Sequence, residues 1–179
     1  VVWADIDSSE VTAGDAITVD AEMLAGIFTL GIGAAGSVAG SGSGSAVAVS
    51  LAGSVGINKI RNNTQARVRN GSTLTTDDNS GAGVSVTAYD DSWINSTAGA
   101  AALSIAVSQK TAVAASLGLS LTINDIENTT RAAVEDSDIF SDGTVTVSAD
   151  SDAEIDSLAF GIAVGVAISG NAAAIAAGA

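Results

Sequence analysis

Leu103 to Asn124 reads LSIAVSQKTAVAASLGLSLTIN, and this stretch decides the fold. In its second half branched apolar residues stand at alternate positions, with small residues between them. The branched positions are Val113, Leu117, Leu119, Leu121 and Ile123. Period-two alternation is typical of a β-strand, because successive side chains point to opposite faces. A similar apolar limb precedes the polar Gln109-Lys110-Thr111, so the stretch predicts two long strands joined by a short turn.

The same long pattern occurs in two further places. Leu30 to Asn58 is one copy and turns at Ser41 to Ser45, whereas Leu158 to Ala179 is the other and turns at Ser169-Gly170-Asn171. The last copy stops within its return limb, which suggests a segment of a longer array. Three copies of one pattern predict a repeat protein.

Shorter segments repeat between the long ones. Ala4 to Ala21 matches Ala132 to Ala149 without a gap, and Ala66 to Ala88 is the same segment with an insertion between Asp77 and Gly83. An insertion confined to a turn is typical of a repeat, because the loop lies outside the stacked core. The period is about 61 to 67 residues. The predicted repeat units are residues 1–61, 62–127 and 128–179, the last of them truncated.

Two all-β architectures fit this pattern. One is a repeat β-solenoid resembling a parallel β-helix, and the other is an antiparallel β-sandwich of long hairpins. Three pairs of oppositely charged residues, all 66 positions apart, favour the solenoid, because stacked strands would bring each pair together at about 4.8 Å. Asn58 and Asn124 have the same separation and would form a ladder, as would Asn62 and Asn128. The charged pairs are Lys59/Asp125, Arg61/Glu127 and Arg69/Glu135.

The two faces of the long strands differ in side-chain size. We expect the branched residues, such as Leu117, Leu119 and Leu121, to fill the core, because burial of branched apolar side chains drives folding. On the other face, Ala114 and Gly118 would let another layer approach closely.

Composition excludes several classes of function. Twenty acidic residues stand against six basic ones, and the net charge of −14 opposes nucleic-acid binding, which needs basic side chains on phosphates. Cysteine and histidine are absent, which removes disulfides, the usual general base and most zinc sites. The apolar Leu158 to Ala179 has Val and Ile two positions apart, so we expect a strand there and no membrane insertion.

Carboxylates gather in the third repeat and form the candidate metal site. Ca²⁺ prefers several carboxylate and carbonyl oxygens. An acidic edge that keeps an apolar stack in solution explains the same residues, and neither an EF-hand nor a calcium β-roll motif occurs. The same region could supply a pair of carboxylates for glycoside hydrolysis. The candidate calcium ligands are Asp136, Asp138, Asp142, Asp150 and Asp152.

Several motifs resemble a known group of proteins. The segments SDGTVTVSA (Ser141 to Ala149), AGDAITVDA (Ala13 to Ala21) and LSLTINDIENTTRA (Leu119 to Ala132) resemble repeats of very large bacterial surface proteins, the leukotoxin-like filamentous adhesins. DSDIFSDGTVTVSADS is also similar to a coil of the filamentous-haemagglutinin type of β-helix. The resemblance implies a secreted or cell-surface adhesin whose repeats form a stalk, and it carries over no catalytic residue.

We therefore expect a structural spacer without catalysis or a required cofactor. The expected partners are neighbouring repeats and, end to end, other copies of the segment, while other parts of the full protein would contact a cell-surface glycan or protein. We expect it at the bacterial surface or outside the cell. The alternatives are a carbohydrate- or calcium-binding β-module and a polysaccharide-cleaving β-helix.

Overall fold

The computed structural model describes residues 1–76, 81–170 and 173–178, and these ranges hold ten strands and no helix. Within them, therefore, no helix has the length and apolar character to cross a membrane. The predicted insertion after Asp77 and the turn through Asn171 fall partly outside the described residues. The strands are β1 Val2–Asp7, β2 Glu10–Ala13, β3 Ile17–Ser41, β4 Ala46–Arg69, β5 Thr73–Thr76, β6 Val84–Ser108, β7 Ala112–Val134, β8 Asp138–Phe140, β9 Val145–Ser169 and β10 Ala174–Gly178.

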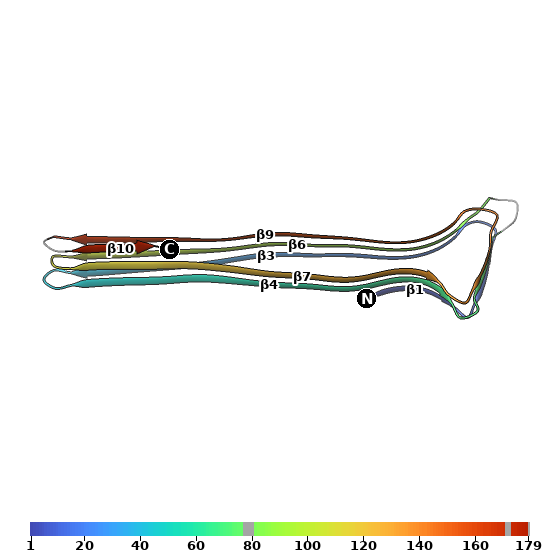
Figure 1. The fold of residues 1–179 in the computed structure, drawn as a ribbon, viewed down its shortest axis with the longest axis horizontal. Coiled ribbons are helices and arrows are strands. Elements are labelled where there is room, and N and C mark those ends of the chain that lie inside the picture. Colours follow the sequence, from blue (N-terminus) through green and yellow to red (C-terminus); the bar gives the residue numbers. More distant parts are fainter. Residues whose placement is uncertain (77–80, 171–172, 179) are drawn as a thin grey trace. The chain divides into compact units, whose positions relative to one another are not determined.

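The strands form three sheets that the chain visits in a fixed order. The sheets have the strand orders β1-β4-β7-β10, β2-β5-β8 and β3-β6-β9. One coil thus consists of a long strand, a second long strand and a short strand, as in β3, β4 and β5 or in β6, β7 and β8 (Figure 1). β1 pairs with β4 in parallel, as β5 does with β8 and β7 with β10. The prediction of a parallel β-solenoid is confirmed.

The alternative of long antiparallel hairpins is wrong. β6 and β7 flank the turn at Gln109 to Thr111, yet they lie in different sheets, and each pairs with the equivalent strand of a neighbouring coil. The polar turn therefore joins two sheets rather than two hydrogen-bonded strands. Period-two alternation alone does not distinguish these cases, because it specifies the strand and not its partner.

The corner between the first and second sheets repeats in every coil. Ser8, Asn70 and Asp136 each follow the strand of the first sheet and adopt positive φ angles of 48°, 58° and 48°. Asparagine and aspartate tolerate this left-handed conformation better than most residues do, because their short polar side chains bond locally. Ser72 follows Asn70 in the corner of its coil, and its hydroxyl accepts a hydrogen bond from the backbone amide of Ser9 in the neighbouring coil at 3.2 Å.

The contacts divide the described fold into two compact units, and each unit takes one segment from every repeat. We call Val1–Gly26, Lys59–Trp93 and Asp125–Glu154 the first unit. We call Ile27–Asn58, Ile94–Asn124 and Ile155–Ala179 the second unit.

The first unit has a conventional core of branched apolar residues. Val68, Leu74 and Val86 are completely buried, and Ile17 and Val19 pack with them. The outward positions between them are polar or charged, such as Arg67 and Arg69 on β4. Large apolar side chains inside and polar ones outside are the pattern that hydrophobic burial favours.

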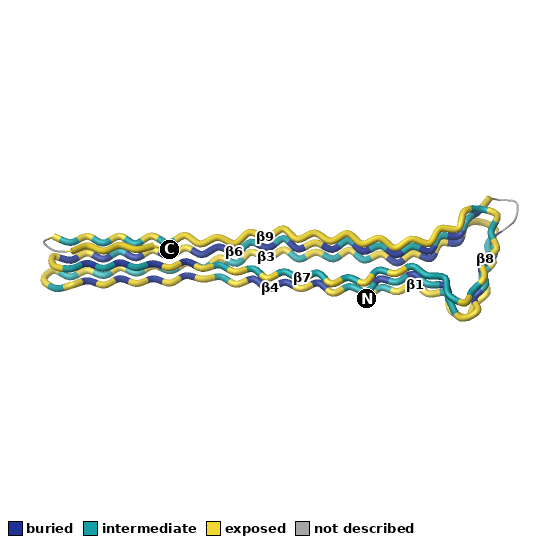
Figure 2. The backbone as a smooth tube through the Cα atoms, in the orientation of Figure 1, coloured by how far each residue is buried: buried dark blue, intermediate teal, exposed yellow. Residues whose placement is uncertain are grey.

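The second unit reverses this pattern, so the expected core is wrong here. Leu119 is 58% exposed and Leu121 is 50% exposed, whereas Ala114 is 1% exposed. The alternation of buried and exposed positions along the strands is visible in Figure 2. The buried clusters of this unit contain only alanines, namely Ala46, Ala48, Ala106, Ala112 and Ala114 in one, and Ala52, Ala100 and Ala102 in the other.

Candidate functional site

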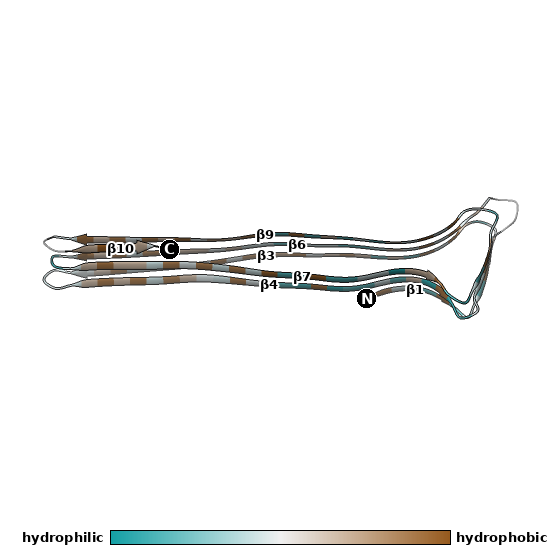
Figure 3. Cartoon of the chain, in the orientation of Figure 1, coloured by the Kyte–Doolittle hydropathy of each residue, from teal (hydrophilic) through white to brown (hydrophobic). Residues whose placement is uncertain are grey.

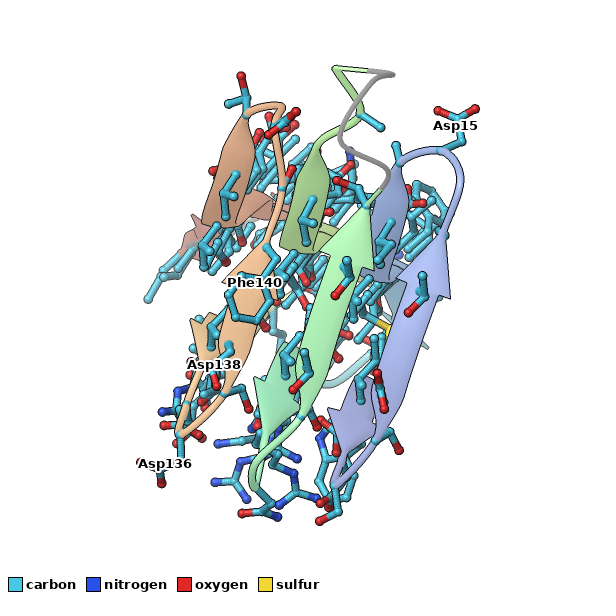
Figure 4. All side chains as sticks on the ribbon, turned by 90° about the vertical axis from the view of Figure 1, so that its right-hand side faces the viewer. Asp15, Asp136, Asp138 and Phe140 are labelled. Carbon is cyan, nitrogen blue, oxygen red and sulfur yellow. The ribbon has the colours of Figure 1, made fainter. Side chains whose placement is uncertain are left out.

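The predicted calcium ligands lie at three different places in the first unit. Asp136 is in the corner before β8, and Asp138 is the first residue of that strand, at the same end of the short sheet (Figure 4). Asp142 lies in the turn after β8, while Asp150 and Asp152 are exposed residues of β9. Across the part of the chain that the structure describes, no group of three or more acidic residues has the arrangement to hold a metal ion.

Asp150 and Asp152 instead belong to an acidic surface around Tyr89. Desolvation raises the pKa of the Tyr89 hydroxyl, and the negative charges of Asp91, Asp152, Asp150 and Glu22 raise it further. These carboxylates come from β3, β6 and β9, which are neighbours in one sheet. Neighbouring like charges repel, and contact with water reduces this repulsion. These carboxylates are therefore better suited to an exposed surface than to a closed ligand cavity.

The sheet containing β4 and β7 carries ion pairs between coils in the first unit. Lys59 pairs with Asp125, and Nε of Arg61 donates to Glu127 at 2.7 Å. Both pairs confirm the predicted stacking of residues 66 positions apart. The hydrogen bond from Arg61 lowers the pKa of the Glu127 carboxyl, with the charges of Arg61 and Lys59 acting in the same direction.

The third predicted pair, Arg69 with Glu135, lies on adjacent coils as expected, because the Glu135 amide donates to the Val68 carbonyl at 2.8 Å, but the two side chains bond to other partners. Arg69 bonds to Asp7 at 2.9 Å and to Asp5 at 3.3 Å, both on β1. Glu135, which directly follows β7, pairs with Arg131 on that strand. Arginine can reach either neighbouring coil, and β1 places carboxylates directly opposite it: Asp7 is the register partner of Arg69.

Arg67 makes the best-defined contacts on this surface. Its Nε and one terminal nitrogen each lie 2.9 Å from an oxygen of Asp5, which is its register partner on β1. The hydrogen bonds to Asp5 raise the pKa of the guanidinium. The guanidinium carbon also lies 5.5 Å from the centre of the Trp3 ring, within cation–π distance.

A buried carboxylate lies inside the first unit. Asp90 is completely buried, and it accepts hydrogen bonds from Ser92 at 2.6 Å and from Thr64 at 3.1 Å. The amide groups of Asn62 and Asn128, which the sequence places one repeat apart, both point to Asp90 and Ser92. Asn62 and Asn128 therefore both donate to one aspartate. Asn58 and Asn124 instead form the expected ladder, in which Nδ2 of Asn58 donates to Oδ1 of Asn124 at 2.7 Å.

The second unit presents apolar surfaces on both of its long sheets. On β3 the outward side chains include Phe28 and Ile32, which are 67% and 72% exposed. Bands of hydrophobic residues alternate with less hydrophobic ones along β4 and β7 (Figure 3). Each surface contains an open depression where outward positions are small. One, of about 510 Å³, lies over Ala34, Gly36 and Ala101. The other, of about 400 Å³, lies over Gly53 beside Leu119 and Leu121.

No family model matches this chain, and neither the curated proteins nor the solved structures that were searched contain a match.

Sequence reasoning missed two features of these surfaces. The acidic partners Asp5 and Asp7 stand 62 positions before Arg67 and Arg69, so a search at a separation of 66 passes over them. The buried position of Asp90 is visible in the alternation, because Ala88, Asp90 and Ser92 have the same parity as the buried Val86. Only a neighbouring strand with donors at matching positions makes that burial tolerable.

Proposed function

We propose that this chain is a structural spacer segment of a large secreted or cell-surface bacterial adhesin, without catalytic activity. The observation that carries the proposal is the bonding of equivalent residues in consecutive coils. Ser54 bonds to Ser120, Asn58 to Asn124, and Arg61 to Glu127, all 66 positions apart. Each coil thus provides the surface on which the next one stacks.

Such bonding produces length rather than a site. In a repeat array each unit contacts its neighbours, and the stability is approximately the sum of these contacts. A further coil therefore extends the array without a change in the coils that are already present. The exposed ion pairs between coils contribute modestly to stability, and more by specifying register than by energy.

The adhesive role and the location at the bacterial surface rest on the motif resemblance. In this proposal the segment holds an adhesive part of the full protein away from the cell. Any Ca²⁺ would stiffen the acidic corner at Asp136 and Asp138 rather than take part in a reaction.

Three measurements on the purified chain test the proposal. We expect small-angle scattering to give an elongated particle and a glycan array to show no binding. In calorimetry with Ca²⁺, we expect the wild type and the double variant Asp136→Asn with Asp138→Asn to give the same result. A compact particle that binds a sugar with a micromolar Kd would overturn the spacer proposal. Calcium binding that depends on the two aspartates would favour a calcium-binding module.

A further inference from the structure

The outward face of β4, β7 and β10 in the second unit carries a continuous set of aliphatic side chains. We call it the aliphatic face. Each of its members is at least 38% exposed, and Ile57 is 71% exposed. β4, β7 and β10 are neighbours in one sheet, so these side chains form a single surface. The aliphatic face consists of Val47, Val49, Leu51, Val55, Ile57, Leu117, Leu119, Leu121, Ile123 and Ile175.

The area of the aliphatic face is sufficient for a stable protein interface. Ten aliphatic residues at these exposures present on the order of 800–1,000 Å² of apolar surface, and a standard interface buries about 800 Å² on each partner. Contiguous apolar patches of more than a few hundred Å² are uncommon on monomers and mark interaction surfaces. A partner that covers this face would thus bury enough area for specific association.

The charge distribution indicates an uncharged partner. The second unit contains only two charged residues, Lys110 and Asp156, and all the others belong to the first unit. Two copies of the aliphatic face would therefore meet without electrostatic repulsion, despite the net charge of −14 on the whole chain. A charged or strongly polar partner would lose hydration here and gain no ion pair.

The aliphatic face contains both a depression and projecting side chains. Gly53 leaves a depression of about 400 Å³ beside the projecting Leu119 and Leu121. If two copies are related by a two-fold axis, a projecting side chain of one copy can enter the depression of the other, and the reverse contact follows by symmetry. Flat β-sheet faces that interdigitate in this way form dry, well-packed interfaces.

A lipid bilayer would also cover an apolar surface, and flotation with phosphatidylcholine vesicles distinguishes it from a second copy of the chain.

We propose that two copies of this chain associate side by side through their aliphatic faces. The inference goes beyond the spacer role, because it concerns lateral pairing of chains and not the length that stacking of coils provides. It does not depend on that role.

Sedimentation of the purified chain at increasing protein concentration tests the pairing. We expect a concentration-dependent dimer in the wild type. Leu119→Lys places a charge at the centre of the face and should raise the dissociation constant at least about a hundredfold. The matched control is Ile32→Lys, which changes an aliphatic residue on β3 that is more exposed than Leu119 and lies outside the aliphatic face, and it should leave the dimer unchanged.

A second variant keeps the test valid if Leu119→Lys does not fold. Val55→Thr with Ile57→Thr retains β-branched side chains suited to a strand and should weaken the dimer about tenfold. Because the chain has no cysteine, Val55→Cys and Ile32→Cys each introduce a single thiol. We expect maleimide to modify Val55→Cys at least about tenfold more slowly than Ile32→Cys once the dimer has formed.

Three results would overturn the inference. The first is a wild-type chain that remains monomeric at every concentration. The second is association that the Leu119 and Val55 variants leave intact, which would indicate end-to-end stacking and would leave the spacer proposal standing. The third is a monomer that floats with phosphatidylcholine vesicles, which would identify lipid as the partner.

Discussion

A Cβ atom placed on Gly33 would lie 2.1 Å from the carbonyl oxygen of Gly53. Gly33 belongs to β3 and Gly53 to β4, which lie in different sheets of the second unit. Real Cβ contacts are essentially never shorter than 3.0 Å. The two sheets therefore approach more closely here than any other residue would allow, and this spacing explains why the buried apolar clusters of the unit consist of alanines.

Gly33→Ala should destabilise the fold. The added methyl group meets backbone rather than a movable side chain, so the sheets must separate, at a cost of about 1–3 kcal/mol in the free energy of unfolding. Gly40→Ala is the control on the same strand, because a Cβ there would have no heavy atom within 4 Å. Denaturant titration of both variants measures the difference, and equal stability of the two would contradict the close approach of the sheets.

Leu119→Ala should have little effect on stability, whereas Leu74→Ala should cost about 2–5 kcal/mol. Leu119 is 58% exposed, while Leu74 is completely buried in the first unit, so only the second truncation leaves a cavity. Thermal or denaturant unfolding at a protein concentration where the chain is monomeric gives both values. If Leu119→Ala lowered the free energy of unfolding as much as Leu74→Ala does, the branched side chains of the second unit would have to be buried.

The alternation along β4 and β7 was sufficient to predict strands, and the charges at a separation of 66 were sufficient to predict parallel stacking. Lys59 with Asp125 and Arg61 with Glu127 occupy the expected positions. The sequence did not determine which face of a strand points inward, because alternation with period two treats both faces alike. The assumption that bulky residues lie inside holds for Val68 and fails for Leu119.

The failure has a physical cause. The interior of the second unit is limited by the distance between its two sheets, and contacts such as Gly161 with the carbonyl oxygen of Gly118 leave no space for a branched side chain. That distance is a property of two packed sheets and is not encoded in either strand alone. The sequence predicted one site for the acidic residues from Asp136 to Asp152, because they are close together along the chain. In the fold they lie in two corners and a strand, and closeness along the chain does not reveal that division.

Asp90→Ala should cost about 3 kcal/mol, because it leaves the buried hydroxyls of Thr64 and Ser92 and the partly buried amide of Asn128 without this acceptor. Asp91→Ala is the matched control, since the neighbouring side chain lies on the outward, partly exposed face of β6. Urea unfolding of both variants provides the measurement. If Asp90→Ala unfolds at the same urea concentration as Asp91→Ala, the buried carboxylate does not organise the interior of the first unit.

Acid should remove the stabilisation that Glu127 provides. The hydrogen bond from Arg61, followed by the charges of Arg61 and Lys59, holds the pKa of Glu127 below its ordinary value of 4.5 in the folded chain. A lowered pKa means that the folded state binds the proton less readily than the unfolded state. The contribution is therefore complete above pH 4.5 and is lost as the pH falls through the folded value.

Arg61→Gln removes the principal cause of the lowered Glu127 pKa. When the pH decreases below 4.5, the free energy of unfolding of this variant should therefore fall less steeply than that of the wild type. Glu127→Gln, which cannot titrate, should show the same shallower dependence, and combining the two changes should add nothing further. Denaturant titrations at a series of acidic pH values measure the slopes, and high salt should reduce the difference because both side chains are exposed. Identical slopes for the wild type and the two single variants would show that the pair between coils does not contribute to acid sensitivity.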